Sequence, residues 1–249
     1  MPQQLLRNRR AVGAFAIAVA LIGACQRGEG PVEGRAAPLD FTSVFETAGS
    51  AVVTIVPIRA DGSTVEDDVL GAGFLVDSKG LVVTARHVLQ GFSAYGVVFA
   101  DRSASRLQLV LTDEKTDLAV VRTEIASPKG AVPLAWVEGQ AAPRVGSWVA
   151  TIGAPFGLER SLTTGIVSAT GRSAKKARLQ IAGLEERTDL IQTDAVLHPG
   201  NSGGPLLDSG GRVLGLVVAS FGVTQRIGFA VPAAALMPLV GAARQKSAR

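Results

Sequence analysis

The stretch Pro199-Gly200-Asn201-Ser202-Gly203-Gly204-Pro205 decides how the rest of this chain is interpreted. It places one serine among three glycines, with a proline at each end. Glycine adopts backbone angles that other residues resist, so the run predicts a tight turn. A serine on a stiff turn can aim its hydroxyl at a substrate, and the N–H groups on either side of Asn201 can converge on an oxyanion. A glycine-rich turn between two strands is the plainer alternative.

Composition favours a β-rich chain with an apolar core and excludes several other classes. Of the 249 residues, 47% are hydrophobic and 29 are glycine, which favours many short strands joined by turns. The single cysteine excludes an internal disulfide framework and a cysteine-rich zinc site. We expect neither a metal nor a cofactor. The net charge is +4, and removing Arg7, Arg9 and Arg10 with a leader would leave 4 − 3 = +1. Nucleic-acid binding therefore gains no support.

The first 25 residues have the pattern of a bacterial export signal. A positive segment ends at Arg10, and the uncharged apolar run 11–24 is too short for a comfortable membrane span. Leu21-Ile22-Gly23-Ala24-Cys25 resembles a lipoprotein cleavage site, whose cysteine carries the lipid; an ordinary signal peptide is the alternative. Residues 26–38 are rich in Gly, Pro and Ala and predict a flexible tether. We therefore expect an envelope or periplasmic protein held on the membrane through Cys25.

The lipid anchor can be tested directly. Radioactive palmitate should label the wild-type protein, and Cys25→Ala should release a soluble protein. Absence of label in the wild type would contradict the anchor.

The remaining chain predicts short strands between two helices. Residues 41–48 have the apolar spacing of one helix face, and residues 232–243 suit a terminal helix followed by a frayed basic tail, 244–249. The segment 61–68 is polar and predicts an exposed loop. Strands are predicted at 51–56, 71–76, 81–84, 95–100, 106–111, 118–121, 147–152, 161–171, 189–193, 213–219 and 227–231. The charged stretch 172–187 predicts a solvated excursion more than a regulatory or nucleic-acid loop.

Two further residues are candidates for chemistry with Ser202. His87 follows directly on the strand 81–84, although a lone histidine beside apolar residues is more often structural. Asp117 stands at the start of the apolar run 118–121, where a carboxylate can be partly buried and still meet an imidazole; a turn aspartate is the alternative. His198 lies four residues before Ser202, too close on a tight loop to reach its hydroxyl, and is assigned to the loop or a subsite.

The surrounding residues carry a family resemblance. Gly71-Ala-Gly-Phe, Leu81-Val-Val-Thr-Ala before His87, Thr116-Asp-Leu-Ala-Val-Val and the run from Gly200 to Pro205 resemble trypsin-like serine proteases, particularly their HtrA (Deg) branch. The sequence departs at Ala85-Arg86, where a polar pair is usual, and at Asn201, where many members carry Asp. The chain stops about where those proteases continue into a PDZ domain. The family forms trimers, so the resemblance also implies a homo-oligomer.

The resemblance implies an all-β fold of two six-stranded antiparallel β-barrels, with a short N-terminal and a C-terminal helix. The protease domain would span 39–243, with barrels at about 50–135 and 143–232. It also implies the order of the chymotrypsin-type triad, with His87 as general base, Asp117 as its orienting acid and Ser202 as nucleophile. The oxyanion hole would lie at Gly200, Asn201 and Ser202. By the same resemblance, the substrate pocket is assigned to Val196, Val218, Ala219, Ser220, Gly228 and Phe229.

These assignments predict a serine endopeptidase that cleaves unfolded or damaged polypeptides after small aliphatic residues, because the predicted pocket carries no acid. Two alternatives remain open. One is a non-catalytic module that keeps the fold and binds exposed polypeptide, and the other is an esterase with the same triad.

Overall fold

The computed structural model describes residues 40–59, 68–139, 141–158, 160–220 and 226–247. All of them belong to the unit Leu39–Arg249. The predicted export signal with Cys25, the tether 26–38 and nearly all of the loop 61–68 lie outside the described residues. Within the described ranges, neither helix combines the length and the hydropathy that a bilayer crossing requires.

The first half of the unit forms a closed antiparallel barrel in the strand order β1-β2-β3-β6-β5-β4. Its strands are β1 (Val52–Pro57), β2 (Gly71–Leu75), β3 (Leu81–Ala85), β4 (Tyr95–Val98), β5 (Ala104–Asp113) and β6 (Leu118–Thr123). Every residue of β1, β2 and β3 is buried, which explains why these segments are continuous apolar runs rather than alternating ones. Phe74 and Leu75 have no exposed surface and belong to the hydrophobic core.

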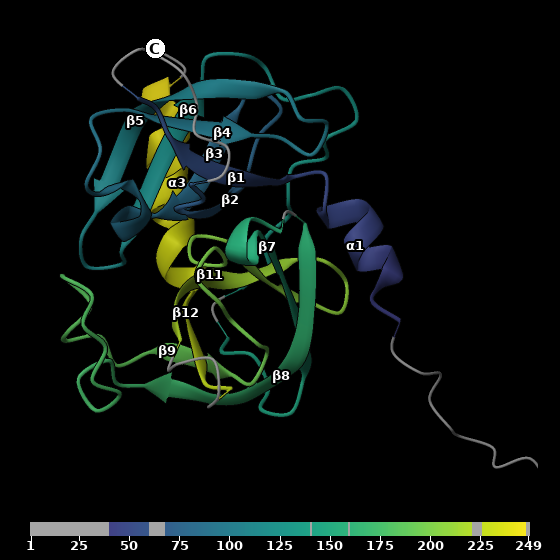
Figure 1. The fold of residues 1–249 in the computed structure, drawn as a ribbon. Coiled ribbons are helices and arrows are strands. Elements are labelled where there is room, and N and C mark those ends of the chain that lie inside the picture. The colour runs from purple at the N-terminus through teal and green to yellow at the C-terminus, as the bar shows by residue number, and fades with distance from the viewer. Residues whose placement is uncertain (1–39, 60–67, 140, 159, 221–225, 248–249) are drawn as a thin grey trace, which may run out of the picture. The chain divides into compact units, whose positions relative to one another are not determined.

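The second half forms another closed antiparallel barrel, in the order β10-β11-β12-β9-β8-β7. Its strands are β7 (Trp148–Gly153), β8 (Ser161–Arg172), β9 (Leu190–Thr193), β10 (Pro205–Asp208), β11 (Val213–Ser220) and β12 (Gly228–Pro232). A short 3-10 turn, η2 (Pro155–Gly157), follows β7. The two-barrel fold predicted from the sequence is therefore confirmed (Figure 1).

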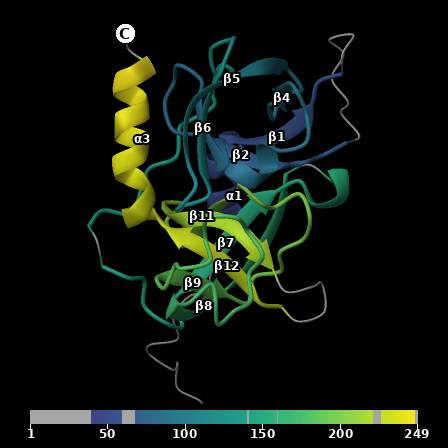
Figure 2. The same cartoon turned by 90° about the vertical axis from the view of Figure 1, so that its left-hand side faces the viewer.

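The two helices of the described residues lie where the sequence predicted them, except at the C-terminal end of the second. The first, α1 (Thr42–Ala48), buries Val44 and Ala48. The last, α3 (Ala233–Ser247), leaves β12 of the second barrel and runs beside the first barrel next to β5 and β6 (Figures 1 and 2). It buries Leu236, Val240 and Ala243, which recur at helical spacing.

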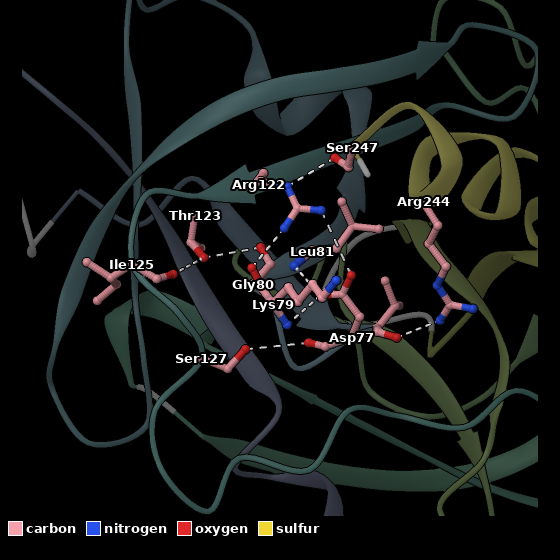
Figure 3. A network of polar contacts seen from close by, with 11 residues as sticks. Asp77, Lys79, Gly80, Leu81, Arg122, Thr123, Ile125, Ser127, Arg244 and Ser247 are labelled. Carbon is pink, nitrogen blue, oxygen red and sulfur yellow. Dashed lines mark hydrogen bonds and ion pairs between the residues drawn. The ribbon is translucent and has the colours of Figure 1, made fainter. Parts of the chain in front are cut away.

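The predicted frayed tail is wrong for residues 244–247, because side chains at the end of α3 bind the first barrel. Arg244 Nη2 donates to the Val76 carbonyl at 2.5 Å, and Lys246 Nζ donates to the Val110 carbonyl at 2.9 Å. Arg122 of β6 donates from Nε to Ser247 Oγ at 3.0 Å and from Nη1 to the Lys79 carbonyl at 2.8 Å (Figure 3). A helix that begins in one barrel is thus fastened to the other.

The charged stretch between β8 and β9 is only partly solvated, contrary to the prediction. Lys175 and Glu186 are exposed and form an ion pair at 3.8 Å. Ala174 and Leu184, by contrast, have no exposed surface, and Leu179 is 8% exposed. The segment 173–187, called the excursion below, is therefore packed onto the core by its apolar side chains.

Candidate active site

His87 is delivered to the site by the strand-to-turn transition after β3. Ala85 is still extended, with ψ at 140°, and the chain then enters the 3-10 turn η1 (Arg86–Leu89). The backbone N–H of Arg86 donates to the Asp117 carbonyl at 2.7 Å, which fixes the start of that turn. The His87 side chain is 29% exposed, so its ring remains accessible.

Both carboxylate oxygens of Asp117 contact His87. Oδ1 accepts the backbone N–H of His87 at 2.9 Å, and Oδ2 lies 2.5 Å from His87 Nδ1. The carboxylate is 1% exposed, and its backbone has φ at 51°, a left-handed conformation that Asp tolerates better than most residues. A carboxylate against Nδ1 favours a proton on that nitrogen, which leaves Nε2 free to accept one. The predicted pairing of His87 with Asp117 is present in the structure.

Ser202 lies on the turn between β9 and β10, and backbone bonds hold that turn to both barrels. The Ser202 carbonyl accepts the N–H of Ala72 in β2 at 2.8 Å. The Gly203 N–H donates to the Val217 carbonyl at 2.8 Å, and the Val217 N–H donates to the Gly204 carbonyl at 2.9 Å. The serine is therefore fixed by β2 of the first barrel and by β11 of the second.

The close approach of β2 to this turn requires glycine on both sides. A Cβ on Gly71 would lie 2.6 Å from the Ser202 carbonyl oxygen. Gly203 has φ at +83°, and a Cβ there would lie 2.3 Å from both the Ala72 carbonyl oxygen and Thr84 Oγ1. The Gly71-x-Gly motif and the turn that carries Ser202 therefore contact each other directly, although Ala72 and Ser202 are 202 − 72 = 130 residues apart in the sequence.

Two backbone N–H groups of the Ser202 turn are candidates for an oxyanion hole. Within the described residues, the N–H groups of Gly200 and Ser202 donate to no acceptor of the chain. The Pro199 carbonyl accepts the Phe156 N–H at 3.3 Å. Because a trans peptide directs its C=O and N–H to opposite sides, the Gly200 N–H points away from the η2 turn. The pair can therefore bind an oxyanion.

Asn201, the third residue of the predicted oxyanion set, is used inside the turn instead. Its N–H donates to the His198 carbonyl at 3.0 Å, and its carbonyl accepts the Gly204 N–H at 3.0 Å. Its side chain is buried against Gly153, where a Cβ would lie 2.4 Å from Asn201 Oδ1. Its backbone N–H is therefore used within the turn and is not free to bind a ligand.

His87 and Ser202 open onto the same cleft, which has a volume of about 260 Å³. Its lining is made up of Leu70, His87, Leu197, His198, Pro199, Gly200, Ser202, Val217, Ala219 and Ser220. Across the described part of the chain, no hydrogen bond joins the Ser202 hydroxyl to the His87 ring. The cleft therefore brings His87, Gly200 and Ser202 together without a direct hydrogen bond between the histidine ring and the serine hydroxyl.

The cleft includes only two of the six residues predicted to form a substrate pocket, Ala219 and Ser220. Val196 and Val218 are not in the lining; their neighbours Leu197 and Val217 are. A bulge between Val217 and Ala219 shifts the register of β11 against β12, which changes the side that each residue faces. Sequence alternation alone cannot locate such a bulge.

The other two predicted pocket residues lie behind the lining. A Cβ on Gly228 would lie 2.4 Å from Leu197 Cδ1, so that glycine makes room for the leucine. Phe229 is 2% exposed and lies in the core. Leu70, just before β2, was missed because no motif marks it; its only signal is its position beside Gly71.

His198 lies at the cleft, as a loop or subsite residue would. Its ring packs against Phe156 with a centroid distance of 5.1 Å, and its Nδ1 is buried without a partner among the described residues. Asp117 contacts the ring of His87 and not that of His198.

Comparison with known proteins agrees with this geometry. A family model described as a trypsin-like peptidase domain matches residues 71–216, which contain His87, Asp117 and Ser202. The chain belongs to the trypsin-like peptidase family. It is 42% identical over 163 residues to HhoA of Synechocystis sp., covering 65% of this chain and 40% of that protein. The family membership inferred from the motifs is confirmed.

Other relatives are proteases of the HtrA type. A Chlamydia trachomatis protein named "probable periplasmic serine endoprotease DegP-like" is 38% identical over 169 residues, covering 67% of this chain and 32% of the relative. The solved structure of AlgW, an HtrA-type protease with a decapeptide, superposes with a TM-score of 0.68 at 28% identity. That match covers 83% of this chain and 68% of AlgW. The match thus covers less than half the length of HhoA and of the DegP-like relative.

Proposed function

We propose that this protein is a serine endopeptidase that hydrolyses polypeptides through an acyl-enzyme. The observation that carries the proposal is the two-oxygen grip of Asp117 on His87, at a cleft that also contains Ser202. Family membership and the protease names of the relatives support the same reaction.

The reaction follows from the roles that the geometry allows. His87 Nε2 accepts the Ser202 hydroxyl proton as the oxygen attacks the scissile carbonyl, and the new oxyanion binds the N–H groups of Gly200 and Ser202. Asp117 keeps the ring oriented and stabilises the imidazolium. His87 then gives its proton to the leaving amine, which breaks the C–N bond and leaves an ester on Ser202. Water, activated by His87, hydrolyses that ester and restores the serine.

The lining of the cleft supports cleavage after small aliphatic residues such as Val, Ala or Ile. Leu197, Val217 and Ala219 give it apolar walls. No Asp or Glu lies among its lining residues, so nothing in the described cleft would pair with a Lys or Arg side chain. Leu197 also packs against Gly228, where a Cβ would lie 2.4 Å from Leu197 Cδ1.

Digestion of unfolded casein tests both parts of this proposal. The wild-type protein should cleave casein, and Ser202→Ala should reduce the rate by a factor on the order of 10⁶, because the nucleophile is gone. Sites mapped by mass spectrometry should follow Val, Ala or Ile.

The outcomes distinguish the alternatives. Binding of casein by both proteins without cleavage by either would favour a non-catalytic polypeptide-binding module. Ester hydrolysis without peptide cleavage would favour an esterase. Cleavage mainly after Lys or Arg would contradict the specificity while leaving the triad intact.

We also propose that the protein acts in a bacterial envelope, on unfolded or damaged proteins. The periplasmic designation of the DegP-like relatives supports this location. The apolar N-terminal run ending at Cys25 supports membrane attachment. The palmitate experiment described above tests the attachment.

A further inference from the structure

The excursion 173–187 of the second barrel contacts the loop that carries Asp117 in the first barrel. That loop, residues 113–117, is called the acid loop here. Arg187 Nη1 donates to the Lys115 carbonyl at 3.0 Å. Gly183 has φ at +94°, and a Cβ there would lie 2.2 Å from the Glu114 carbonyl oxygen. One hydrogen bond and one close backbone approach therefore join the two segments.

Other contacts, besides the one to the acid loop, fix the Arg187 side chain. Its Nε and Nη2 donate to the two carboxylate oxygens of Asp189, at 2.8 and 2.6 Å. Its side chain is only 14% exposed. Its backbone N–H donates to the Leu184 carbonyl, and its carbonyl accepts the Ala174 N–H. The Nη1 group is thus preorganised for the Lys115 carbonyl, because the planar guanidinium fixes the direction of its N–H bonds.

The acid loop, in turn, determines the position of the Asp117 carboxylate. The Asp117 N–H donates to the Glu114 carbonyl at 3.2 Å, so Lys115 lies within one tight turn. Asp113 Oδ2 closes the same turn by accepting from the Thr116 N–H at 2.9 Å. The Glu114 side chain pairs with Arg86, the residue before His87. A shift of Lys115 would therefore be transmitted to the carboxylate that holds His87.

We propose that Arg187 is a positioning residue: from the second barrel it holds the acid loop so that Asp117 keeps both hydrogen bonds to His87. The proposal rests on the proposed function for its effect on turnover. It gives the excursion a definite role, in which the packing of the second barrel sets the orientation of the base in the first.

The test compares Arg187→Ala with Arg212→Ala. Arg212 also forms a two-pronged ion pair with an aspartate, Asp208, but on a hairpin remote from the acid loop. Arg187→Ala should lower kcat on a Val-containing peptide substrate by about tenfold to a hundredfold, because small displacements of a catalytic group are costly. KM should change by less than about twofold, since Arg187 does not line the cleft. Arg212→Ala should match the wild type.

A second readout does not depend on activity. The low-field NMR signal of the His87 Nδ1 proton reports its bond to Asp117 and should move or broaden in Arg187→Ala but not in Arg212→Ala. Gly183→Ala should have the same effect, because its methyl group would displace the Glu114 backbone. If Arg187→Ala does not fold, Arg187→Lys is tested in its place and should show the same changes in kcat and in the His87 signal. A lysine ammonium cannot bind the Lys115 carbonyl and the Asp189 carboxylate with the geometry of the guanidinium.

An unchanged kcat together with an unchanged His87 signal in a folded Arg187 variant would overturn the proposal. If the wild type hydrolyses nothing, the proposed function fails, and the NMR signal alone still decides whether Arg187 positions Asp117.

Discussion

Replacing Asp117 by Asn should lower kcat/KM by about 10⁴-fold with little loss of stability. The Asp117 carboxylate accepts from both the backbone N–H and Nδ1 of His87. An amide can accept at only one of these positions and must place its NH₂ at the other. With NH₂ against Nδ1, the ring must carry its proton on Nε2 and can no longer accept the Ser202 proton. The reverse orientation sets NH₂ against the His87 backbone N–H.

The fold should survive this change because Asn, like Asp, tolerates the left-handed backbone at position 117. Asp113→Asn is the matched control on the same loop, because its amide oxygen can still accept from the Thr116 N–H and hydroxyl. Steady-state kinetics and urea unfolding of both variants provide the comparison. A folded Asp117→Asn protein within tenfold of wild-type kcat/KM would show that the carboxylate does not orient the base.

Replacing Gly200 by Ala should lower kcat by about 10²- to 10³-fold, the loss expected when one oxyanion donor is displaced. Gly200 has φ at +102°, and a Cβ there would lie 2.1 Å from the Ala154 carbonyl oxygen. Because that oxygen belongs to the backbone, the turn must move and carry the Gly200 N–H away from the substrate. KM should change much less than kcat, since the donor acts mainly on the transition state.

Gly130→Ala controls for backbone strain alone. Gly130 has φ at +92°, and a Cβ there would meet nothing within 4 Å. Both variants carry the cost of a left-handed alanine, but only Gly200→Ala displaces the oxyanion donor. Equal kcat values for the two variants would contradict the assignment of Gly200 to the oxyanion hole.

The strands followed from local patterns in the sequence, whereas the two barrels and the pairing of His87 with Asp117 were predicted through the family resemblance of the motifs around them. Continuous apolar runs identified β1 to β3, whose residues are all buried. Gly71 and Gly203 belong to motifs that the sequence analysis singled out. The structure shows why glycine is needed at both positions: the backbones of the two segments lie too close together for a side chain.

Features that depend on contacts between distant segments were missed. The end of α3 contains Arg244 and Lys246, whose charges predicted a solvated tail. In the structure both side chains donate to backbone carbonyls, Arg244 in the β2–β3 turn and Lys246 in β5. The charges of the excursion likewise hid the burial of Ala174 and Leu184. Four of the six predicted pocket residues do not line the cleft; in β11 the lining includes Val217 in place of Val218, next to a bulge that leaves no mark on the sequence pattern.

Labelling with a fluorophosphonate tests the central claim most directly, because the reagent reacts with a serine hydroxyl only when a neighbouring base accepts its proton. We expect one phosphonyl adduct on the folded wild-type protein, mapped by mass spectrometry to Ser202, and none on His87→Ala. A folded wild-type protein that remains unlabelled, or an adduct on another residue, would contradict the account.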